Sequence, residues 1–450
     1  MENPAQIFAQ FVTETGLDQI PDDAVSAAKK IITDSIGVII GGMAEPDIQS
    51  LISTTEAHGK GNIPLLGTGV TTSIELASLI HGTAGTVLEM DEGHQFAKGH
   101  PGMHILPAML SFVHEKPITA EEFLRAFVMG YDVSARIGLA SSLNPNTHPH
   151  GTWGGIGGAA ALGLLEGLNR EEMATLLNIA SSLTLATSRK TMLEGGTVRN
   201  VYTGYANQMA HLSLTLLKSG FTGEQNGIDT IFGQVISNSF DHDRAFEALG
   251  ERFEVCRNYF KLHACCRYNH AALDALNILM AAHPELHDAS AISSIHVESY
   301  SLAAELSDPS PNNVLACKFS IPFAIATTLY HQSSDVLSFT ENAVQNKNIQ
   351  QLAAKVSLVE NKGMTKKLPD FRPASVKIAM NNGAVFETEV QTNRGDWQDP
   401  YKDHDLKDKF ISLASRIFNH KDAEDQYDQL MTLEQQNLNL LFGKAFRIGD

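Results

Sequence analysis

The strongest constraint on the fold is a succession of apolar segments with helical periodicity, which extends to about residue 260. The apolar residues Val25, Ala28 and Ile32 recur at helical spacing. Thr72 and Glu75 form a capping-box pattern ahead of another such segment. Many of these segments are rich in Ala and Gly and apolar on nearly every side, which is typical of helices buried in a large core. We therefore predict helices at 22–42, 74–88, 120–138, 154–167, 170–186 and 206–219.

After about residue 290 the hydrophobic period changes from helical to two. Asn382-Gly383 is a strong hairpin signal between two of the alternating segments. The tail from 403 to 450 is charged and helical again, so we expect it to return to the helical part. We predict strands at 294–300, 355–359, 375–380 and 384–390, and helices at 271–282 and 323–331. The expected fold is mainly α, with an all-helical domain (1–264 and 403–450) and a smaller α+β lid domain (265–402).

The composition excludes several classes of protein. A hydrophobic fraction of 43% and a charged fraction of 19% are ordinary for a globular protein. Lys and Arg total 33 against 51 Asp and Glu, and this net charge of −18 argues against nucleic-acid partners and against a polybasic membrane-surface protein.

Location is predicted from what the sequence does not contain. We find no apolar run of the ~18 residues that a membrane span needs. The N-terminal segment lacks the basic and apolar regions of a secretory signal. Four cysteines in 450 residues make no disulfide framework. We expect no membrane partner and a cytoplasmic location.

Three polar clusters interrupt the apolar helices, and the first covers residues 89–104. Its carboxylates, imidazoles and one ammonium group are suited to acid–base catalysis, although a solvated loop has the same composition. His100 and His104 have the spacing of two metal ligands on one helix face, but Pro101-Gly102 between them disfavours that helix. We therefore predict no metal site.

The second cluster covers residues 144–155 and precedes an Ala-rich helix. His148 and His150 stand among glycines that allow a close approach of the backbone. The free N–H groups of the following helix suit an anion. Tight helix packing through Gly and Ala explains the same glycines, and both interpretations can hold together.

The third cluster covers residues 261–270, at the predicted domain junction, where ligand sites are common. Cys265 or Cys266 could be a nucleophile, but cysteines with apolar neighbours are more often packing residues. Arg267 and His270 are three apart, so on a helix they share a face and could bind a carboxylate and move a proton.

The three clusters, in this order, resemble the MmgE/PrpD superfamily, which includes 2-methylcitrate dehydratase, cis-aconitate decarboxylase and iminodisuccinate epimerase. The resemblance covers about residues 25–400, and the ordered set of motifs is more specific than any one of them. The segments that carry it are DSIGVIIGG, LLGTGVTTSIELASLIHGTAGTVLEMDEG with GHPG, HPHGTWGGIGGAAALGLLEGL, GGTVRNVYTGYANQMA, LHACCRYNHAALDAL and ACKFSIPFAIA.

The resemblance implies cofactor-free chemistry on small di- or tricarboxylates, at a site between the two domains and usually in a homodimer. No cofactor is therefore expected, and the expected partners are a small anionic carboxylate and a second copy of the chain. The residues that the resemblance and the clusters assign to catalysis are His100, His148, Asp91, His270 and Arg199. Those assigned to substrate binding are Arg267, Lys98, Glu89, His150 and Tyr202.

The sequence departs from the family pattern at several positions. Glu89 stands at a position that is usually Asp, and Gly93 at one that is usually Thr or Ser. Arg199 and Tyr202 replace the family's Lys and His, and Phe323 stands near a position that is usually Tyr. Because Arg stays charged where a buried Lys can exchange a proton, Arg199 suits carboxylate binding better than proton donation. This weakens the dehydratase and decarboxylase assignments.

The expected first step is loss of a proton from the carbon next to a carboxylate, with His100 or His148 as base and Asp91 tuning it. Loss of hydroxide then gives a dehydratase, reprotonation on the other face an epimerase, and loss of CO₂ a decarboxylase. The commonest activity in the family favours the dehydratase. The Lys98-Gly-His100 sequence favours the epimerase as an alternative. An inactive helical scaffold is the alternative of another class.

Overall fold

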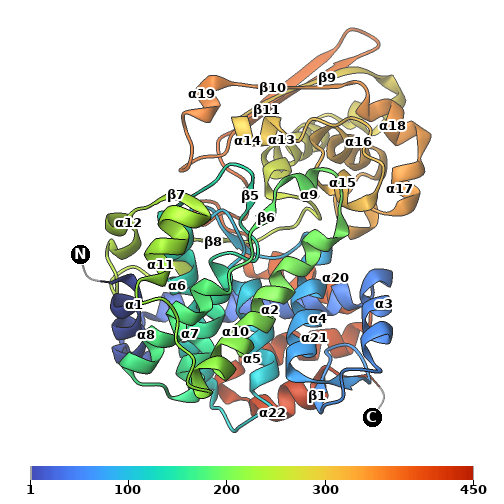
Figure 1. Cartoon of the computed structure of the whole chain (residues 1–450). Helices are drawn as coiled ribbons and strands as arrows, with labels where there is room; N and C mark the ends of the chain where they lie inside the picture. The colour runs from blue at the N-terminus through green and yellow to red at the C-terminus, as the bar shows by residue number, and fades with distance from the viewer. Residues whose placement is uncertain (1–2, 449–450) are drawn as a thin grey trace.

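The computed structural model describes residues 3–448, and within it a helical domain and a smaller mixed domain lie one above the other (Figure 1). The predicted helical domain includes residues 1–2 and 449–450, which lie outside the described residues. The architecture is mainly α with a smaller α+β part, as predicted from the sequence.

The helical domain is built around long buried helices. Its main helices are α1 (Pro4–Glu14), α2 (Asp22–Met43), α3 (Pro46–Thr55), α4 (Ile74–Val87), α5 (Leu106–Phe112), α6 (Ala120–Ala140), α7 (Gly154–Glu166), α8 (Arg170–Ser182) and α10 (Val201–Lys218). The helix α6 packs on α7, and α10 packs on both α4 and α7. Small residues allow this close approach: a Cβ atom added at Gly204 of α10 would lie 2.2 Å from the Leu79 carbonyl oxygen of α4.

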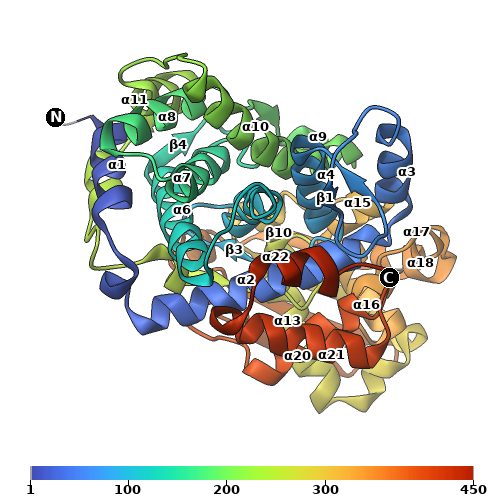
Figure 2. The same cartoon turned by 90° about the horizontal axis from the view of Figure 1, so that it is seen from below.

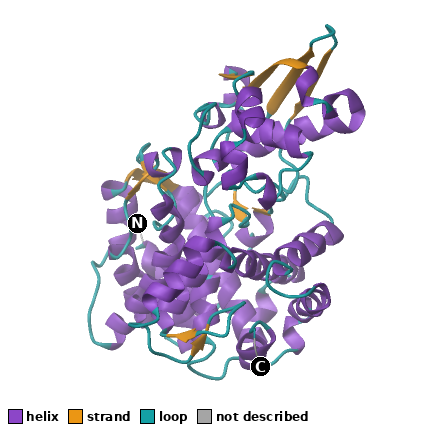
Figure 3. Cartoon of the chain, turned by 90° about the vertical axis from the view of Figure 1, so that its right-hand side faces the viewer, coloured by secondary structure: helices purple, strands orange, loops and turns teal. Residues whose placement is uncertain are grey.

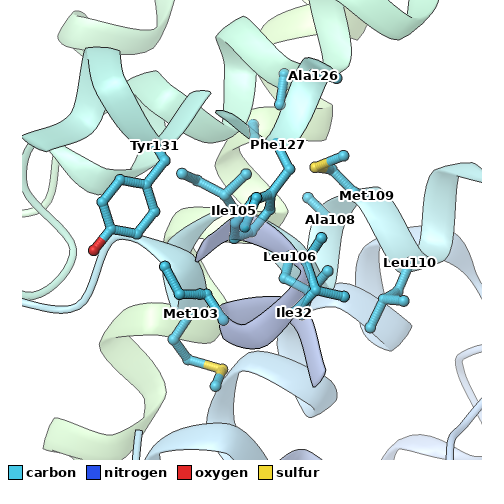
Figure 4. Close-up of a cluster of buried hydrophobic side chains, with 14 of the residues drawn as sticks. Ile32, Met103, Ile105, Leu106, Ala108, Met109, Leu110, Ala126, Phe127 and Tyr131 are labelled. Atoms are coloured by element: carbon cyan, nitrogen blue, oxygen red, sulfur yellow. The ribbon is translucent and has the colours of Figure 1, made fainter. Parts of the chain in front are cut away.

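The core of this domain is continuous and apolar, and it is large enough to bury whole helices. Figure 4 shows one part of it, where Ile105 and Leu106 pack against Phe127 and Ile32. Tyr131 stands at the edge of this group with its hydroxyl pointing away, and that hydroxyl donates a hydrogen bond to Glu92, 3.0 Å away. The core therefore supports the loop that carries the first polar cluster.

The C-terminal tail returns to the helical domain. The helix α20 (Asp403–Ala414) packs on α2 and on α21 (His420–Met431), and Figure 2 shows these red helices beside the blue α2. Phe410 of α20 and Phe442 belong to the same buried core as the first helices. This packing supports the domain bounds that we propose, 1–264 with 403–450 and 265–402.

The smaller domain contains a four-stranded sheet in the order β10 (Val356–Glu360), β9 (Ile292–Ser299), β11 (Ala374–Met380), β12 (Val385–Val390). The pair β9–β10 is parallel, whereas β11 pairs antiparallel with both of its neighbours. Gly383, with φ +89°, makes the turn between β11 and β12. This sheet lies at the far end of the molecule from the helical core (Figure 3).

Helices and a second buried core complete the smaller domain. The helix α13 (His270–Ala282) packs on β11 and β12, and α16 (Ile321–His331) packs on α13 and on α18 (Lys347–Ala353). The second core includes residues from Ala264 to Val390 together with Leu88, Met90 and Met192 from the helical side. The two domains are thus joined by apolar packing as well as by the site described below.

Some boundaries differ from the predictions. The N-cap of α4 is Ser73, whose hydroxyl accepts a hydrogen bond from Leu76 N, so the capping box expected between Thr72 and Glu75 was wrong. The Thr72 hydroxyl instead donates to Gly59 O. The helix α8 ends at Ser182, before the predicted 186, and α10 begins at Val201, before the predicted 206. No helix within residues 3–448 has both the length and the apolar character needed to cross a bilayer.

Candidate active site

A small cavity of about 60 Å³ lies at the junction of the two domains. All three polar clusters contribute to its wall, and they are joined there by residues from the smaller domain. The lining includes five basic side chains and a single carboxylate, so the cavity is locally cationic in a chain whose net charge is −18. The lining residues are Glu89, Lys98, His100, His148, Pro149, His150, Arg189, Met192, Arg199, Tyr259, Cys266, Arg267, Tyr268, Phe319 and Arg372.

The acidic loop of the first cluster starts where α4 ends. Glu89 adopts a left-handed backbone conformation, with φ +57°, which bulky residues rarely take. Two buried lysines hold the loop at its carbonyl groups: Lys318 Nζ donates to Val87 O (2.9 Å) and Lys409 Nζ to Met90 O (2.7 Å). The carboxylates are therefore fixed in place by contacts with both domains.

Glu89 and Asp91 form a buried charged network with Lys261 and Arg199. Lys261 Nζ lies 3.3 Å from Glu89 Oε2 and 3.0 Å from Asp91 Oδ1, and Arg199 forms an ion pair with Glu89 Oε1. Burial opposes ionisation of Glu89, but the charges of Arg199 and Lys261 outweigh it and lower the pKa of that carboxyl. Burial likewise opposes the charge on Lys261, yet Asp91 and Glu89 raise the pKa of its ammonium group. Glu89, Asp91 and Lys261 are therefore charged at neutral pH.

His100 has one nitrogen occupied and one available. Its Nδ1 donates to Glu92 O, 2.5 Å away, because a carbonyl can only accept. Asp91 Oδ2 lies 3.1 Å from the same nitrogen, without the geometry of a hydrogen bond. Burial lowers the pKa of His100 to about 4, although the nearby Asp91 charge acts in the opposite direction. The imidazole is thus neutral, with the lone pair of Nε2 available on the cavity wall.

His148 has the opposite tautomer. Its Nδ1 accepts a hydrogen bond from His150 N (3.0 Å), so the neutral ring carries its proton on Nε2. Burial, reinforced by the charge of Arg199, holds the pKa of His148 well below its usual value. The ring of His150 stands edge-on between the two, with centroids 4.7 Å from His100 and 4.6 Å from His148. The cavity therefore presents one imidazole acceptor and one imidazole donor.

Arg267 joins the cavity to the smaller domain. Its guanidinium forms an ion pair with Asp396, lies 4.4 Å from the ring centroid of Tyr259, and donates to His270 Nδ1 (2.9 Å). His270 is fully buried and its Nε2 lies 3.2 Å from Cys265 O. Both nitrogens of His270 are thus engaged inside the protein, and the ring contacts the cavity only through Arg267.

The structure brings most of the predicted site residues together. Seven of them line the cavity: Glu89, Lys98, His100, His148, His150, Arg199 and Arg267. Asp91 lies directly behind Glu89 and His100, and Tyr202 packs on His148 with ring centroids 5.8 Å apart. His270 lies behind Arg267 and outside the cavity wall. A direct role of His270 on substrate receives no support from this position.

Sequence reasoning missed several residues of the site. Lys261 was visible as the first residue of the third cluster, but nothing in the sequence placed it between two carboxylates. Tyr259 precedes that cluster by two residues. Arg189 and Arg372 come from segments with no motif, and only their positive charge in an acidic chain could have indicated an anion site.

The arrangement of the cavity residues supports neither a metal site nor a cysteine nucleophile. Within residues 3–448, no group of three or more His, Cys, Asp or Glu side chains has the arrangement of a metal site. Cys266 lines the cavity, but burial raises the pKa of its thiol to about 11. A thiol with a raised pKa is a weak nucleophile at neutral pH.

Two family models match the chain. Residues 6–245 match the MmgE/PrpD N-terminal domain and residues 263–435 match the MmgE/PrpD C-terminal domain. The chain belongs to the MmgE/PrpD family. The two matches divide at the cavity, since the first two polar clusters fall in one domain and the third begins the other.

Curated relatives of the chain are named as decarboxylases. A cis-aconitate decarboxylase of Aspergillus terreus is 23% identical over 446 residues, which cover 93% of this chain and 90% of the relative. A cis-aconitate decarboxylase-like protein, oryM, of Aspergillus oryzae is 22% identical over 94% of this chain and 93% of its own length. The cis-aconitate decarboxylase of Mus musculus is 21% identical, with 97% and 91% covered.

Proposed function

We propose that the protein removes a proton from the carbon next to a carboxylate of a small di- or tricarboxylate, with His100 as the base. The observation that carries this proposal is the pair of opposite tautomers: His100 presents an unprotonated Nε2 and His148 an Nε2–H to one cationic cavity. A general base must be neutral at working pH and within reach of the proton, and His100 meets the first condition because of its burial.

The second requirement is stabilisation of the enolate that forms. Removing this proton places additional negative charge on a carboxylate, which is very unfavourable in water. Arg199 and Arg267 present fixed guanidinium groups in a buried site, where an ion pair is stronger than in water. Each is already balanced by one protein carboxylate, which keeps it in position before substrate arrives.

Loss of hydroxide is the outcome that we propose, which makes the protein a dehydratase-like lyase acting on a 2-methylcitrate-like hydroxy acid. A leaving hydroxide needs a proton, and the proton that His100 has taken from the carbon supplies it, so that water leaves and His100 returns to its neutral form. The Nε2–H of His148, on the same cavity wall, donates a hydrogen bond to the departing oxygen. Arg199 binds the carboxylate in this scheme and transfers no proton.

Decarboxylation is the second candidate, because the relatives described above are named as cis-aconitate decarboxylases. The same base and the same cations suit loss of CO₂ from an unsaturated tricarboxylate. Epimerisation by reprotonation on the other face is a third outcome of the same first step, and Lys98 two residues before His100 is the feature that favours it.

We also propose a cytoplasmic homodimer. The four cysteines are all free thiols, which is usual in a reducing compartment. Val198, Leu212 and Phe221, on or beside α10, are exposed apolar residues that a second copy could cover. Light scattering of the purified protein measures the mass of the assembly, and a monomer at micromolar concentration contradicts the dimer.

The test is proton NMR in D₂O with a panel of citrate-like, aconitate-like and aspartate-like acids. We expect loss of an α-proton signal for at least one acid and a new vinyl signal if hydroxide leaves. His100→Gln should slow this exchange by about 10²-fold or more. His420→Gln, which changes an exposed histidine far from the cavity, is the matched control. A folded protein that exchanges no proton from any of these acids favours the inactive scaffold instead.

A further inference from the structure

The five cations of the cavity differ in how they are balanced. Arg189, Arg199 and Arg267 each form an ion pair with a protein carboxylate. Within residues 3–448, neither Lys98 nor Arg372 has a carboxylate within ion-pair distance, although both line the cavity. Two positive charges therefore face the cavity without a counter-charge from the protein.

Arg372 is the more buried of the two, with 5% of its surface exposed. Its Nη2 donates to Gln95 O (2.8 Å), and its guanidinium carbon lies 5.5 Å from the ring centroid of Tyr268. Within residues 3–448 its Nε and Nη1 form no hydrogen bond, and they are not among the fully enclosed polar atoms, so they remain accessible from the cavity that Arg372 lines. Asp396 supports the charge of Arg372 from a distance, but that carboxylate is already bound to Arg267. A guanidinium that keeps free donors on the wall of a small cavity is suited to binding an anion there.

Lys98 reaches the cavity from the helical domain. Its backbone is left-handed, with φ +60°, a conformation that non-glycine residues rarely adopt and that is frequent at functional sites. Partial burial and the charges of Arg372, Arg244 and Arg189 all lower the pKa of its ammonium group. No carboxylate is among the groups that act on Lys98 most strongly, and the charge of Arg372 repels that of Lys98.

The two residues belong to segments that already touch across the domain junction. Gln95, three residues before Lys98, donates from Nε2 to Asp370 O (3.0 Å), and Arg372 returns a hydrogen bond to Gln95 O. Because Lys98 and Arg372 come from different domains, an anion bound by both joins the two domains directly.

We propose that Lys98 and Arg372 form a second anion subsite, which binds a carboxylate remote from the carbon that His100 deprotonates. Arg199 and Arg267 bind two other carboxylates, so a ligand with a third carboxylate gains a contact that a dicarboxylate lacks. This inference rests on the proposed function only where it refers to the carbon that His100 deprotonates. Binding of an anion at Lys98 and Arg372 does not depend on catalysis. Arg372 acts as a specificity residue, since it holds the substrate at a distance from the proton transfer.

Calorimetric titration with two inert acids tests the subsite directly. Tricarballylate has three carboxylates, and glutarate has the same chain without the central one. Arg372→Gln should weaken tricarballylate binding about 10- to 100-fold, as expected for a charge-assisted hydrogen bond, and glutarate binding by less than about threefold. Lys98→Met should show the same selectivity with a smaller loss, since Lys98 is more exposed to solvent than Arg372.

Two further variants control for folding and for long-range charge. Arg372→Lys keeps the charge and should recover part of the affinity for tricarballylate. Arg244→Gln removes a cation that acts on Lys98 but lies outside the cavity wall, so it should change both affinities by less than about threefold. Equal losses of both acids in Arg372→Gln, or no loss of either, contradict the subsite.

The subsite and the proposed function can fail separately. A wild-type protein that exchanges substrate protons while Arg372→Gln binds tricarballylate normally contradicts the subsite alone. A wild-type protein that exchanges no proton, but prefers tricarballylate through Arg372, contradicts the proposed function alone and supports the subsite.

Discussion

Two buried charged networks begin in the same loop, and only one of them faces a cavity. His94 lies 3.0 Å from Glu254, whose carboxylate also binds Arg252 and Arg257. The backbone N–H of Glu254 donates a hydrogen bond to Asp132 Oδ1. Six residues along the loop, His100 lies beside Asp91 at the cavity wall. Both networks combine imidazole, carboxylate and basic side chains, so residue type alone does not distinguish them.

The difference lies in which donors and acceptors remain free. Arg136 is fully buried, binds Asp132, and donates to the carbonyls of Ala245, Glu247 and Arg252. Such a saturated network has nothing left to offer a ligand and acts as structure. At the cavity, by contrast, His100 Nε2 and the free donors of Arg372 have no partner within residues 3–448. A polar group that lines a cavity and has no partner within the protein is the better sign of a functional site.

The largest expected effect is a loss of folding stability when the saturated network around Arg136 is broken. Arg136→Met should lower the free energy of unfolding by about 3–5 kcal/mol, because it leaves the buried Asp132 without its cationic partner, with only the hydrogen bond from Glu254 N. Urea denaturation followed by circular dichroism measures this change. Arg170→Gln, at a half-exposed ion pair with Glu14, is the control and should cost less than about 1 kcal/mol. A loss below about 1 kcal/mol in Arg136→Met means that the network is not structural.

The next effect is a pH dependence that arises beside the cavity. Burial lowers the pKa of His104 to about 4 from the ordinary 6.5. Between these values the imidazole is protonated in the unfolded chain but not in the folded protein, so the free energy of unfolding falls as pH falls from 6.5 toward 4. The His104 ring donates to His100 O and accepts from Gly151 N, and a glutamine amide can do both.

His104→Gln should therefore keep the fold and make the free energy of unfolding less dependent on pH. The slope should fall by about 1.4 kcal/mol per pH unit, which is the contribution of one proton. Urea denaturation at several values of pH between 4.5 and 7.5 measures the slope. An unchanged slope in the variant means that His104 is protonated in the folded protein.

The smallest effect concerns Glu92, which supports His100 from its backbone carbonyl. Burial raises the pKa of Glu92 to about 8, although hydrogen bonds from Gly102 N and Tyr131 oppose the shift. Between pH 4.5 and 8 the folded protein holds a proton that the unfolded chain has released, so this group lowers stability as pH rises. Glu92→Gln should be more stable than wild type by about 1–2 kcal/mol near pH 8, with no gain below pH 4.5. A gain that does not vary with pH contradicts this titration.

The sequence predicted the fold well where local periodicity decides it. The Ala- and Gly-rich helices and the Asn382-Gly383 hairpin depend on near neighbours, and all of them are present. Family motifs also predicted that His100, His148 and Arg199 belong to one site, and all three line the same cavity. What could not be predicted depends on contacts between distant segments, as when Arg372 meets the loop of Gln95 across the domain junction. The tautomers of His100 and His148 are set by backbone groups in the same way, so only coordinates distinguish the acceptor from the donor.

The measurement that tests the central claim most directly compares deuterium exchange and product formation in His100→Gln and His148→Gln, with any acid that the wild type turns over. If His100 is the base and His148 the donor, His100→Gln loses both exchange and product by about 10²-fold or more. His148→Gln should keep measurable exchange while product formation falls. Exchange that survives in His100→Gln and disappears in His148→Gln contradicts the assignment of the two roles.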